Sequence, residues 1–258
     1  MAQPDLSGRR VLVTGATSGL GRAMAAALVQ AGARVALTSR DLGRAEAVAE
    51  ELGAGAIGVG LDVRDATSVS AGVDRAYGLL GGLDMLVNNA GIGMRTVNPR
   101  FMSDPQPFWQ VAPAGFRDVL ETKATGSFLV ARAVVPRMIA NGAGRVVTIS
   151  MNEQTMVRRG FVPYGPAGAA VDALAQVMAA DLAETPVMAN ILLPGGATDT
   201  GMIPDDMTDE ARAGLLDPAI MGPPIVWLAS LQAAGVHGER IVAREFDDWL
   251  AAREKKHL

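Results

Sequence analysis

Residues 9–27 read Arg-Arg-Val-Leu-Val-Thr-Gly-Ala-Thr-Ser-Gly-Leu-Gly-Arg-Ala-Met-Ala-Ala-Ala. The apolar run at residues 11–13 is typical of a buried parallel strand. Alanine-rich sequence that favours helix begins at Arg22. Between the two segments lie three glycines, which are Gly15, Gly19 and Gly21. The stretch therefore predicts a strand, a glycine turn and a helix in that order.

This order of elements predicts a phosphate-binding turn. The first N–H groups of a helix have no partner within the helix, and the helix dipole favours an anion beside them. Glycines let the backbone come close to a pyrophosphate. A tight turn that binds no ligand is the alternative. The candidate contacts in the turn are Gly15, Thr17, Ser18, Gly19, Leu20 and Gly21.

Composition narrows the class of protein. The 258 residues carry a net charge of −4, which argues against nucleic acid as a main partner. There is no cysteine, and the two histidines lie far apart in the sequence, so we expect neither disulfides nor a metal site. The first eight residues show no signal-peptide core, and no apolar run is long enough to span a membrane. We therefore expect a cytoplasmic protein.

Predicted strands and helices alternate along the whole chain. This alternation predicts a single α/β domain over residues 1–258, with a doubly wound parallel sheet of about seven strands and helices on both faces. The predicted strands are 11–13, 34–38, 56–61, 84–87, 144–150, 187–193 and 238–243. One predicted helix begins at Arg22, and the others are 41–52, 65–80, 114–141, 164–184 and 218–231.

The end of the second strand bears on which nicotinamide dinucleotide would bind. An acidic residue there would accept hydrogen bonds from the adenosine ribose, whereas an arginine suits a 2′-phosphate. Here a small neutral residue, Ser39, precedes Arg40, which favours NADP and leaves NAD possible. Asp41 is expected to cap the next helix. Arg44 is a second candidate for the phosphate, although a solvated helix face is the simpler interpretation.

Two motifs resemble those of the short-chain dehydrogenase/reductase family. Residues 14–21, Thr-Gly-Ala-Thr-Ser-Gly-Leu-Gly, match its TGxxxGxG turn, and residues 88–91, Asn-Asn-Ala-Gly, match its NNAG motif. The resemblance implies a single-domain Rossmann fold, a nicotinamide dinucleotide, a small-molecule substrate and a homotetramer or homodimer. It also implies further cofactor contacts at Asp62, Val63, Asn89, Ala90, Gly91, Tyr164, Pro194, Gly195, Thr198 and Thr200.

Three further segments are assigned mainly by composition. Residues 92–113 hold several aromatic, methionine and proline residues, which predicts an ordered flap beside the nicotinamide end of the site. A surface excursion is the equal alternative. Residues 197–217 resemble the mobile substrate lid of the family. The charged tail 244–258 has Trp249 and Leu250 as its expected apolar anchors.

The resemblance weakens at the catalytic positions. The family uses a tyrosine to pass a proton, a lysine four residues later, a serine before the tyrosine and an asparagine on the preceding helix. Tyr164 matches the tyrosine. The other three positions hold Gly168, Met151 and Lys123. Ser150 or Asn152, both next to Met151, could polarise the substrate oxygen instead.

Two interpretations follow from these substitutions. In the first, Lys123 supplies from the neighbouring helix the positive charge that lowers the pKa of Tyr164. The chain is then an NADP-preferring oxidoreductase that acts on a small to medium, partly apolar carbonyl or alcohol. In the second, Lys123 is a surface or space-filling residue and the redox reaction is lost. That leaves a redox-neutral enzyme of the hydratase, dehydratase or C–C lyase type, or a dinucleotide-binding protein without catalysis.

Overall fold

The computed structural model describes residues 4–256 and contains one seven-stranded sheet in the order β3-β2-β1-β4-β5-β6-β7. Every pairing within it is parallel, which confirms the predicted doubly wound sheet. The order reverses between β1 and β4, and ligands bind at such a switch point in open α/β sheets. The strands are β1 (Arg10–Val13), β2 (Arg34–Ser39), β3 (Ala56–Gly60), β4 (Met85–Asn88), β5 (Gly144–Ile149), β6 (Val187–Leu193) and β7 (Arg240–Val242).

Helices cover both faces of the sheet. Alternate strand residues point to opposite sides, so Val11 and Val13 join one core cluster while Leu12 joins the other. The first face is covered by α1 (Gly19–Gln30), α2 (Leu42–Leu52) and α9 (Gly222–Ala229). The second is covered by α3 (Ala66–Leu80), α5 (Gly126–Ala140) and α7 (Tyr164–Leu182).

The helix ends follow local rules that the sequence contains. The Asp41 carboxylate accepts a hydrogen bond from the Arg44 N–H, so it caps α2 as predicted. Asp65 caps α3 in the same way, through the Thr67 N–H. Gly81 ends α3 in the left-handed conformation that glycine adopts without strain.

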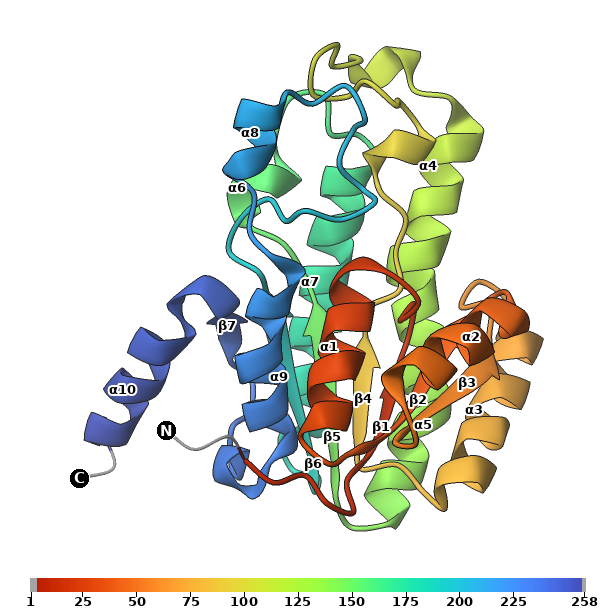
Figure 1. Ribbon diagram of the computed structural model, residues 1–258, viewed down its shortest axis with the longest axis vertical. Helices are drawn as coiled ribbons and strands as arrows, with labels where there is room; N and C mark the ends of the chain where they lie inside the picture. The colour runs from red at the N-terminus through yellow and green to blue at the C-terminus, as the bar shows by residue number, and fades with distance from the viewer. Residues whose placement is uncertain (1–3, 257–258) are drawn as a thin grey trace.

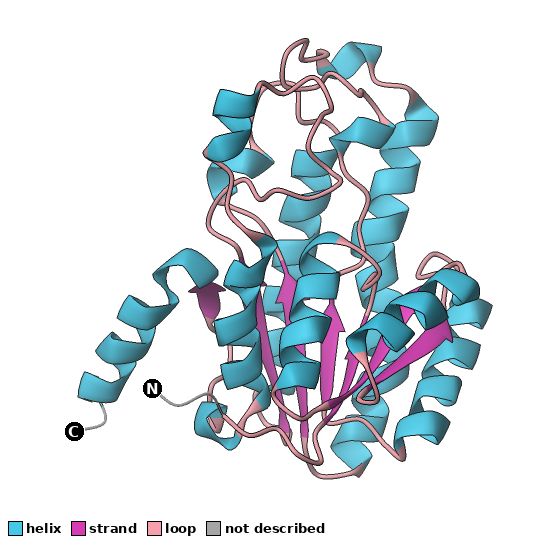
Figure 2. Ribbon diagram, viewed as in Figure 1, coloured by secondary structure: helices cyan, strands magenta, loops and turns pink. Residues whose placement is uncertain are grey.

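The carboxyl ends of all seven strands face one end of the molecule, where the long loops gather. Figure 2 shows the strand arrows pointing together toward this end, and Figure 1 shows the loops and short helices above it. This layer contains α4 (Pro113–Leu120), α6 (Glu153–Met156) and α8 (Asp209–Ala213). The 3-10 turns η1 (Met94–Thr96) and η2 (Phe108–Gln110) interrupt the flap.

The structure corrects three predicted segments. The helix predicted at 114–141 is not regular, because a π turn, η3 (Glu121–Thr125), separates α4 from α5. The helix predicted at 218–231 consists of a 3-10 turn, η4 (Pro218–Met221), followed by α9. In the tail, α10 (Phe246–Lys256) has a third anchor that was missed, because Phe246 is buried and stacks with Trp249.

No helix within residues 4–256 has the length and apolar character required to cross a bilayer. Three short 3-10 turns complete the described part of the chain. One of the turns is the η4 segment, where the Asp217 carboxylate accepts a hydrogen bond from the Ala219 N–H. The other two are η5 (Leu231–Ala233) and η6 (Ala243–Glu245).

The central strand should tolerate truncation poorly. Leu12 is fully buried between β2 and β4, so Leu12→Ala should lower the free energy of unfolding by about 2–5 kcal/mol. Leu231→Ala is the matched control, because Leu231 is 78% exposed and its loss should change stability by less than about 0.5 kcal/mol. Urea unfolding of both variants measures the difference, and equal midpoints would contradict the assignment of Leu12 to the core.

Candidate active site

The glycine turn is tied to the end of β4 by Thr14. The Thr14 hydroxyl accepts hydrogen bonds from the backbone N–H groups of Asn89, at 2.9 Å, and Ala90, at 3.0 Å. The Asn89 side-chain amide donates in return to the carbonyls of Thr14, at 2.9 Å, and Gly15, at 3.1 Å. The two motifs found in the sequence therefore form one hydrogen-bonded unit at the switch point.

This unit leaves a cradle that only glycine fits. Gly15 and Gly19 have φ values of +62° and +54°, in the left-handed region that side chains disfavour. A Cβ at Gly21 would collide with the Asn89 amide nitrogen and the Gly15 carbonyl oxygen. Bare backbone at the start of α1 is what a pyrophosphate requires, so these residues fit a dinucleotide.

A cavity of about 530 Å³ extends from this turn over the ends of β4, β5 and β6. Its lining comes from the glycine turn, the NNAG motif, the π turn η3 before α5, the loop after β5, the start of α7 and the lid. The sequence-predicted residues that line it are Gly15, Ser18, Gly19, Leu20, Gly21, Asn89, Gly91, Lys123, Ser150, Asn152, Tyr164, Pro194, Thr198 and Thr200.

Other predicted cofactor residues lie outside the lining of this cavity. They are Thr17, Ser39, Arg40, Asp62, Val63, Ala90 and Gly195. Arg40 is exposed after β2, and the Asp62 carboxylate is held by Arg64, whose guanidinium lowers the pKa of Asp62. The residues that follow β2 and β3 lie beside an open surface, so they are not part of the cavity lining.

Arg44 is exposed on α2, as its simpler sequence interpretation predicts. It also lines the cavity with Ser18 and Leu20. The cause is its position in the first turn of α2, which begins beside the glycine turn. In the sequence, the spacing of one helical turn between Arg40 and Arg44 is the feature that indicates this position of Arg44.

The π turn directs Lys123 into the cavity. A π turn takes in one more residue than a regular helical turn and often occurs at functional sites. Lys123 is only 8% exposed, and its Nζ lies 4.9 Å from the centre of the Tyr164 ring. A Cβ at Gly91 would approach the Lys123 side chain to 3.1 Å, so the lysine lies between the NNAG motif and the tyrosine.

Burial affects the two titratable groups in opposite directions. Removal from water lowers the pKa of Lys123 to about 8, because the charged ammonium is disfavoured. Burial raises the pKa of the Tyr164 hydroxyl, because the phenolate is disfavoured. The hydroxyl faces the lid, 3.9 Å from the Met202 sulfur. An ammonium over the tyrosine ring opposes both shifts when it is charged.

The side chain of Met151 fills the space beside Gly168. A Cβ at Gly168 would lie 2.5 Å from the Met151 Cε and 2.7 Å from its sulfur. The methionine at the family's serine position thus occupies the space above the family's lysine position. Met151 is buried, so it, rather than Lys123, fills the gap that the missing lysine leaves.

Ser150 lines the cavity, but its hydroxyl is already engaged. It donates a hydrogen bond of 2.6 Å to the Asp172 carboxylate, which also binds Gln176 and Arg240. The expected role of Ser150 as donor to a substrate oxygen is therefore disfavoured, since a buried carboxylate holds its proton. Asn152 begins α6, makes no side-chain capping bond there and lines the cavity.

The flap and the lid supply an apolar wall. Phe101 and Phe161 meet edge to face at 5.5 Å, with Met94 and Met102 beside them. These residues line the cavity, as expected for part of the flap. Phe108 and Trp109 do not, because they are 68% and 72% exposed and pack against each other instead.

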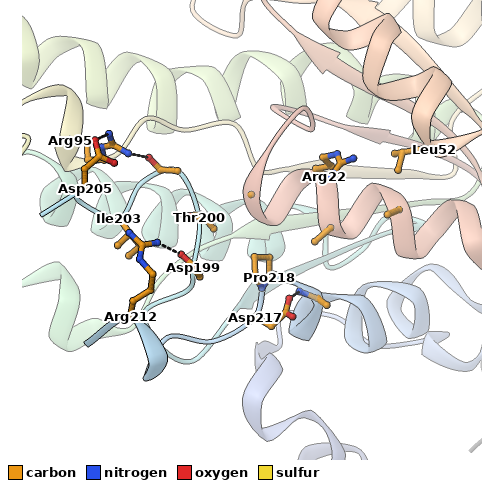
Figure 3. A pocket seen from close by; sticks show the side chains of 15 residues that line it. Arg22, Leu52, Arg95, Asp199, Thr200, Ile203, Asp205, Arg212, Asp217 and Pro218 are labelled. Atoms are coloured by element: carbon orange, nitrogen blue, oxygen red, sulfur yellow. Dashed lines mark hydrogen bonds and ion pairs between the residues drawn. The ribbon is translucent and has the colours of Figure 1, made fainter. Parts of the chain in front are cut away.

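A second cavity of about 680 Å³ lies on the other side of the lid, next to α1. Figure 3 shows Arg95 and Arg212 pairing with Asp205 and Asp199, at 2.5 and 2.6 Å. The third arginine there, Arg22, pairs with Glu51. These charges are already balanced, so the second cavity lacks the free groups that would bind an ion, and its pairs hold the lid.

Comparison with known proteins agrees with this geometry. Residues 9–211 match the sequence model of the family described as short chain dehydrogenase. The 3-oxoacyl-(acyl-carrier-protein) reductase of Vibrio harveyi is 33% identical over 250 residues, which cover 92% of this chain and 96% of that protein. Gluconate 5-dehydrogenase of Gluconobacter oxydans is 34% identical over 201 residues, 76% of this chain and 75% of that protein.

A solved structure shows the same fold. The 3-ketoacyl-(acyl-carrier-protein) reductase of Brucella melitensis, in complex with NADH, superposes with a TM-score of 0.81 and 29% identity, covering 92% of this chain and 97% of that one. The chain belongs to the short-chain dehydrogenase/reductase family. It is an NAD(P)-dependent oxidoreductase, and the redox-neutral and binding-only alternatives are not favoured.

The cradle gives a direct test of the dinucleotide site. Gly21→Ala should weaken binding of NADPH or NADH at least about tenfold, because its methyl group would displace the Asn89 amide from the turn. Gly78→Ala, in α3, is the control, since a Cβ there meets nothing within 4 Å. Calorimetric titration measures both, and equal affinity in the two variants would show that the turn does not bind the dinucleotide.

Proposed function

We propose that this enzyme transfers a hydride between NADP and the carbonyl or alcohol carbon of a small to medium, partly apolar substrate with an anionic end. The observation that carries the proposal is the meeting of Lys123 and Tyr164 at the floor of the glycine-lined cavity. When bound, nicotinamide dinucleotide supplies or accepts the hydride. Every other role falls to side chains of this chain.

Tyr164 passes the proton. In the direction of reduction its hydroxyl donates to the oxygen of the carbonyl group, and in oxidation its phenolate removes that proton. Burial alone opposes the phenolate. The ammonium of Lys123, 4.9 Å from the ring centre, favours it, because negative charge in a phenolate spreads over the ring. Asn152 polarises the substrate oxygen in place of Ser150.

The charge of the cavity supports an anionic substrate. Its lining holds Arg44, Arg158 and Lys123, which form no ion pair among the described residues, and Arg95, whose charge is balanced by Asp205. No aspartate or glutamate lines it within the described part of the chain. Arg158 lies 4.7 Å over the Phe161 ring, at the apolar wall. A substrate with an apolar body and a carboxylate or phosphate would satisfy both features. One relative is named for gluconate, a carboxylate, which supports an anionic end, and another is named for a 3-oxoacyl group, which supports a carbonyl substrate.

The cofactor preference is proposed from two arginines. Arg40 follows β2, and Arg44 lines the cavity one helical turn later. Both can approach the adenosine ribose, where a guanidinium suits a 2′-phosphate. The coulombic effect of Arg40 on Asp62 supports their location beside the adenine end of the site.

Assembly and location are proposed from the family and the helix surfaces. We place the enzyme in the cytoplasm as a homotetramer or homodimer. Exposed apolar side chains on α5 and α7, Phe128 at 46% and Val177 at 56% exposed, support an interface between copies.

Replacement of Arg40 or Arg44 should affect the binding of NADPH and NADH differently. Arg40→Ala and Arg44→Ala should each weaken NADPH binding about tenfold and leave NADH binding within about twofold, because only NADPH carries the 2′-phosphate. Arg75→Ala, on the exposed side of α3, is the control for loss of one positive charge. Calorimetry with both dinucleotides measures the effect. If NADH binds more tightly than NADPH to the unaltered enzyme, the preference is the reverse.

Lys123 should produce a step in the pH profile. Its pKa is about 8, so the ammonium is present below pH 8 and is lost as the pH rises through 8. Turnover in carbonyl reduction should therefore hold below pH 8 and decline above it. Lys123→Met should lower turnover about 100-fold at pH 7 and remove the step. Lys255→Met, in the exposed tail, should change neither, and a Lys123→Met profile that matches the unaltered enzyme would refute the role of Lys123.

The substrate class is tested with matched pairs. A 3-oxo acid should be reduced with a KM about tenfold lower than its methyl ester, because Arg158 binds the carboxylate. Arg158→Ala should abolish this difference. Arg159→Ala is the control, since Arg159 is exposed and outside the cavity lining. Spectrophotometric oxidation of NADPH measures both substrates, and an ester preferred over its acid would contradict the proposal.

A further inference from the structure

Lysine is rare in this chain, and its placement is selective. Among 258 residues there are three lysines, Lys123, Lys255 and Lys256, and every other cationic side chain is arginine or histidine. Two of the three lie in the final helix, α10. Outside the final helix the chain therefore has a single lysine side-chain amine, and it lies in the catalytic cavity. Arginine cannot replace this chemistry, because its guanidinium stays protonated and is not a nucleophile near neutral pH.

The surroundings of Lys123 keep its amine free of a carboxylate partner. The cavity lining has no acidic residue among the described residues, and Lys123 forms none of the ion pairs found there. Glu121, in the same π turn, is exposed while Lys123 is buried. Its described neighbours are the Tyr164 ring, with the Nζ 4.9 Å from the ring centre, and the backbone of Gly91.

These surroundings favour the neutral amine. Burial lowers the pKa of Lys123 to about 8, so roughly a tenth of it is unprotonated at pH 7. For an exposed lysine with the ordinary pKa near 10.4, the unprotonated fraction is smaller by roughly two orders of magnitude. Desolvated lysines in apolar pockets are the ones that react with carbonyl compounds.

We propose that Lys123 captures aldehydes and ketones covalently, as an imine, when they enter the cavity. The neutral Nζ attacks the carbonyl carbon, and one proton passes from the nitrogen to the carbonyl oxygen to give a carbinolamine. The Tyr164 hydroxyl then donates a proton to the hydroxyl group of the carbinolamine, which leaves as water while the C=N bond forms. The nitrogen gives its remaining proton to the Tyr164 phenolate, which restores the neutral tyrosine. One amine and one carbonyl give one imine and one water, with no change in oxidation state.

This capture goes beyond hydride transfer and needs no dinucleotide. The cavity of about 530 Å³ already accommodates a carbonyl substrate beside Tyr164 under the proposed function. The same carbonyl carbon comes within reach of an amine that projects over the tyrosine ring. The adduct would occupy the substrate position, so carbonyl compounds would act as reversible covalent inhibitors of the oxidoreductase.

The test is reductive trapping on the full chain without dinucleotide. The protein is incubated at pH 7 with propanal and sodium cyanoborohydride, which reduces an imine to a stable propyl amine, and is then digested and analysed by mass spectrometry. We expect the Lys123 peptide to be labelled at least about tenfold faster than the peptide with Lys255 and Lys256, which serves as an internal reference.

Two controls make the result decisive. In urea-unfolded protein the lysine peptides should be labelled at similar rates, which shows that the Lys123 peptide is detectable. Lys123→Arg keeps a cation over Tyr164 but has no nucleophilic side-chain amine, so label should remain only at the tail lysines and the α-amino group of the chain. Labelling of the tail with an unmodified Lys123 in the folded protein would overturn the proposal. Because this readout requires no turnover, failure of imine capture and failure of hydride transfer are distinguishable.

Discussion

The hydrogen bonds of Thr14 hold the site together. One hydroxyl joins the end of β1 to the backbone after β4, and the Asn89 amide returns two bonds to the glycine turn. Because these strands flank the switch point, the contact fixes the start of α1 beside the NNAG motif. The dinucleotide cradle, the position of Gly91 and therefore the location of Lys123 all depend on it.

The departures from the family's catalytic pattern form two connected changes. Met151 stands where the family has its serine, and Gly168 stands where the family has its lysine. The Met151 side chain packs over Gly168 and fills the space beside it. Ser150 turns to Asp172, which Arg240 and Gln176 also hold. Across the cavity, the π turn brings Lys123 over the Tyr164 ring. The positive charge beside Tyr164 therefore comes from the π turn and not from α7, where the family's pattern has its lysine.

Local sequence rules predicted most of the fold. Strand and helix alternation, the caps at Asp41 and Asp65 and the glycine turn depend on neighbouring residues, and the structure shows each of them. The π turn and the partner of Ser150 were not predictable in this way. Each depends on contacts between residues distant in sequence, such as Ser150 with Asp172. A pattern fixes which residue types are present, but not where long side chains point.

The central claim is that the cavity holds one lysine with an ionisation unlike any other in the protein. The most direct measurement is nuclear magnetic resonance titration of protein labelled with nitrogen-15 at its three lysines. The account predicts one signal that titrates near pH 8 and is absent from Lys123→Met. If no signal titrates near pH 8, Lys123 is an ordinary solvated lysine, and its placement over Tyr164 is contradicted.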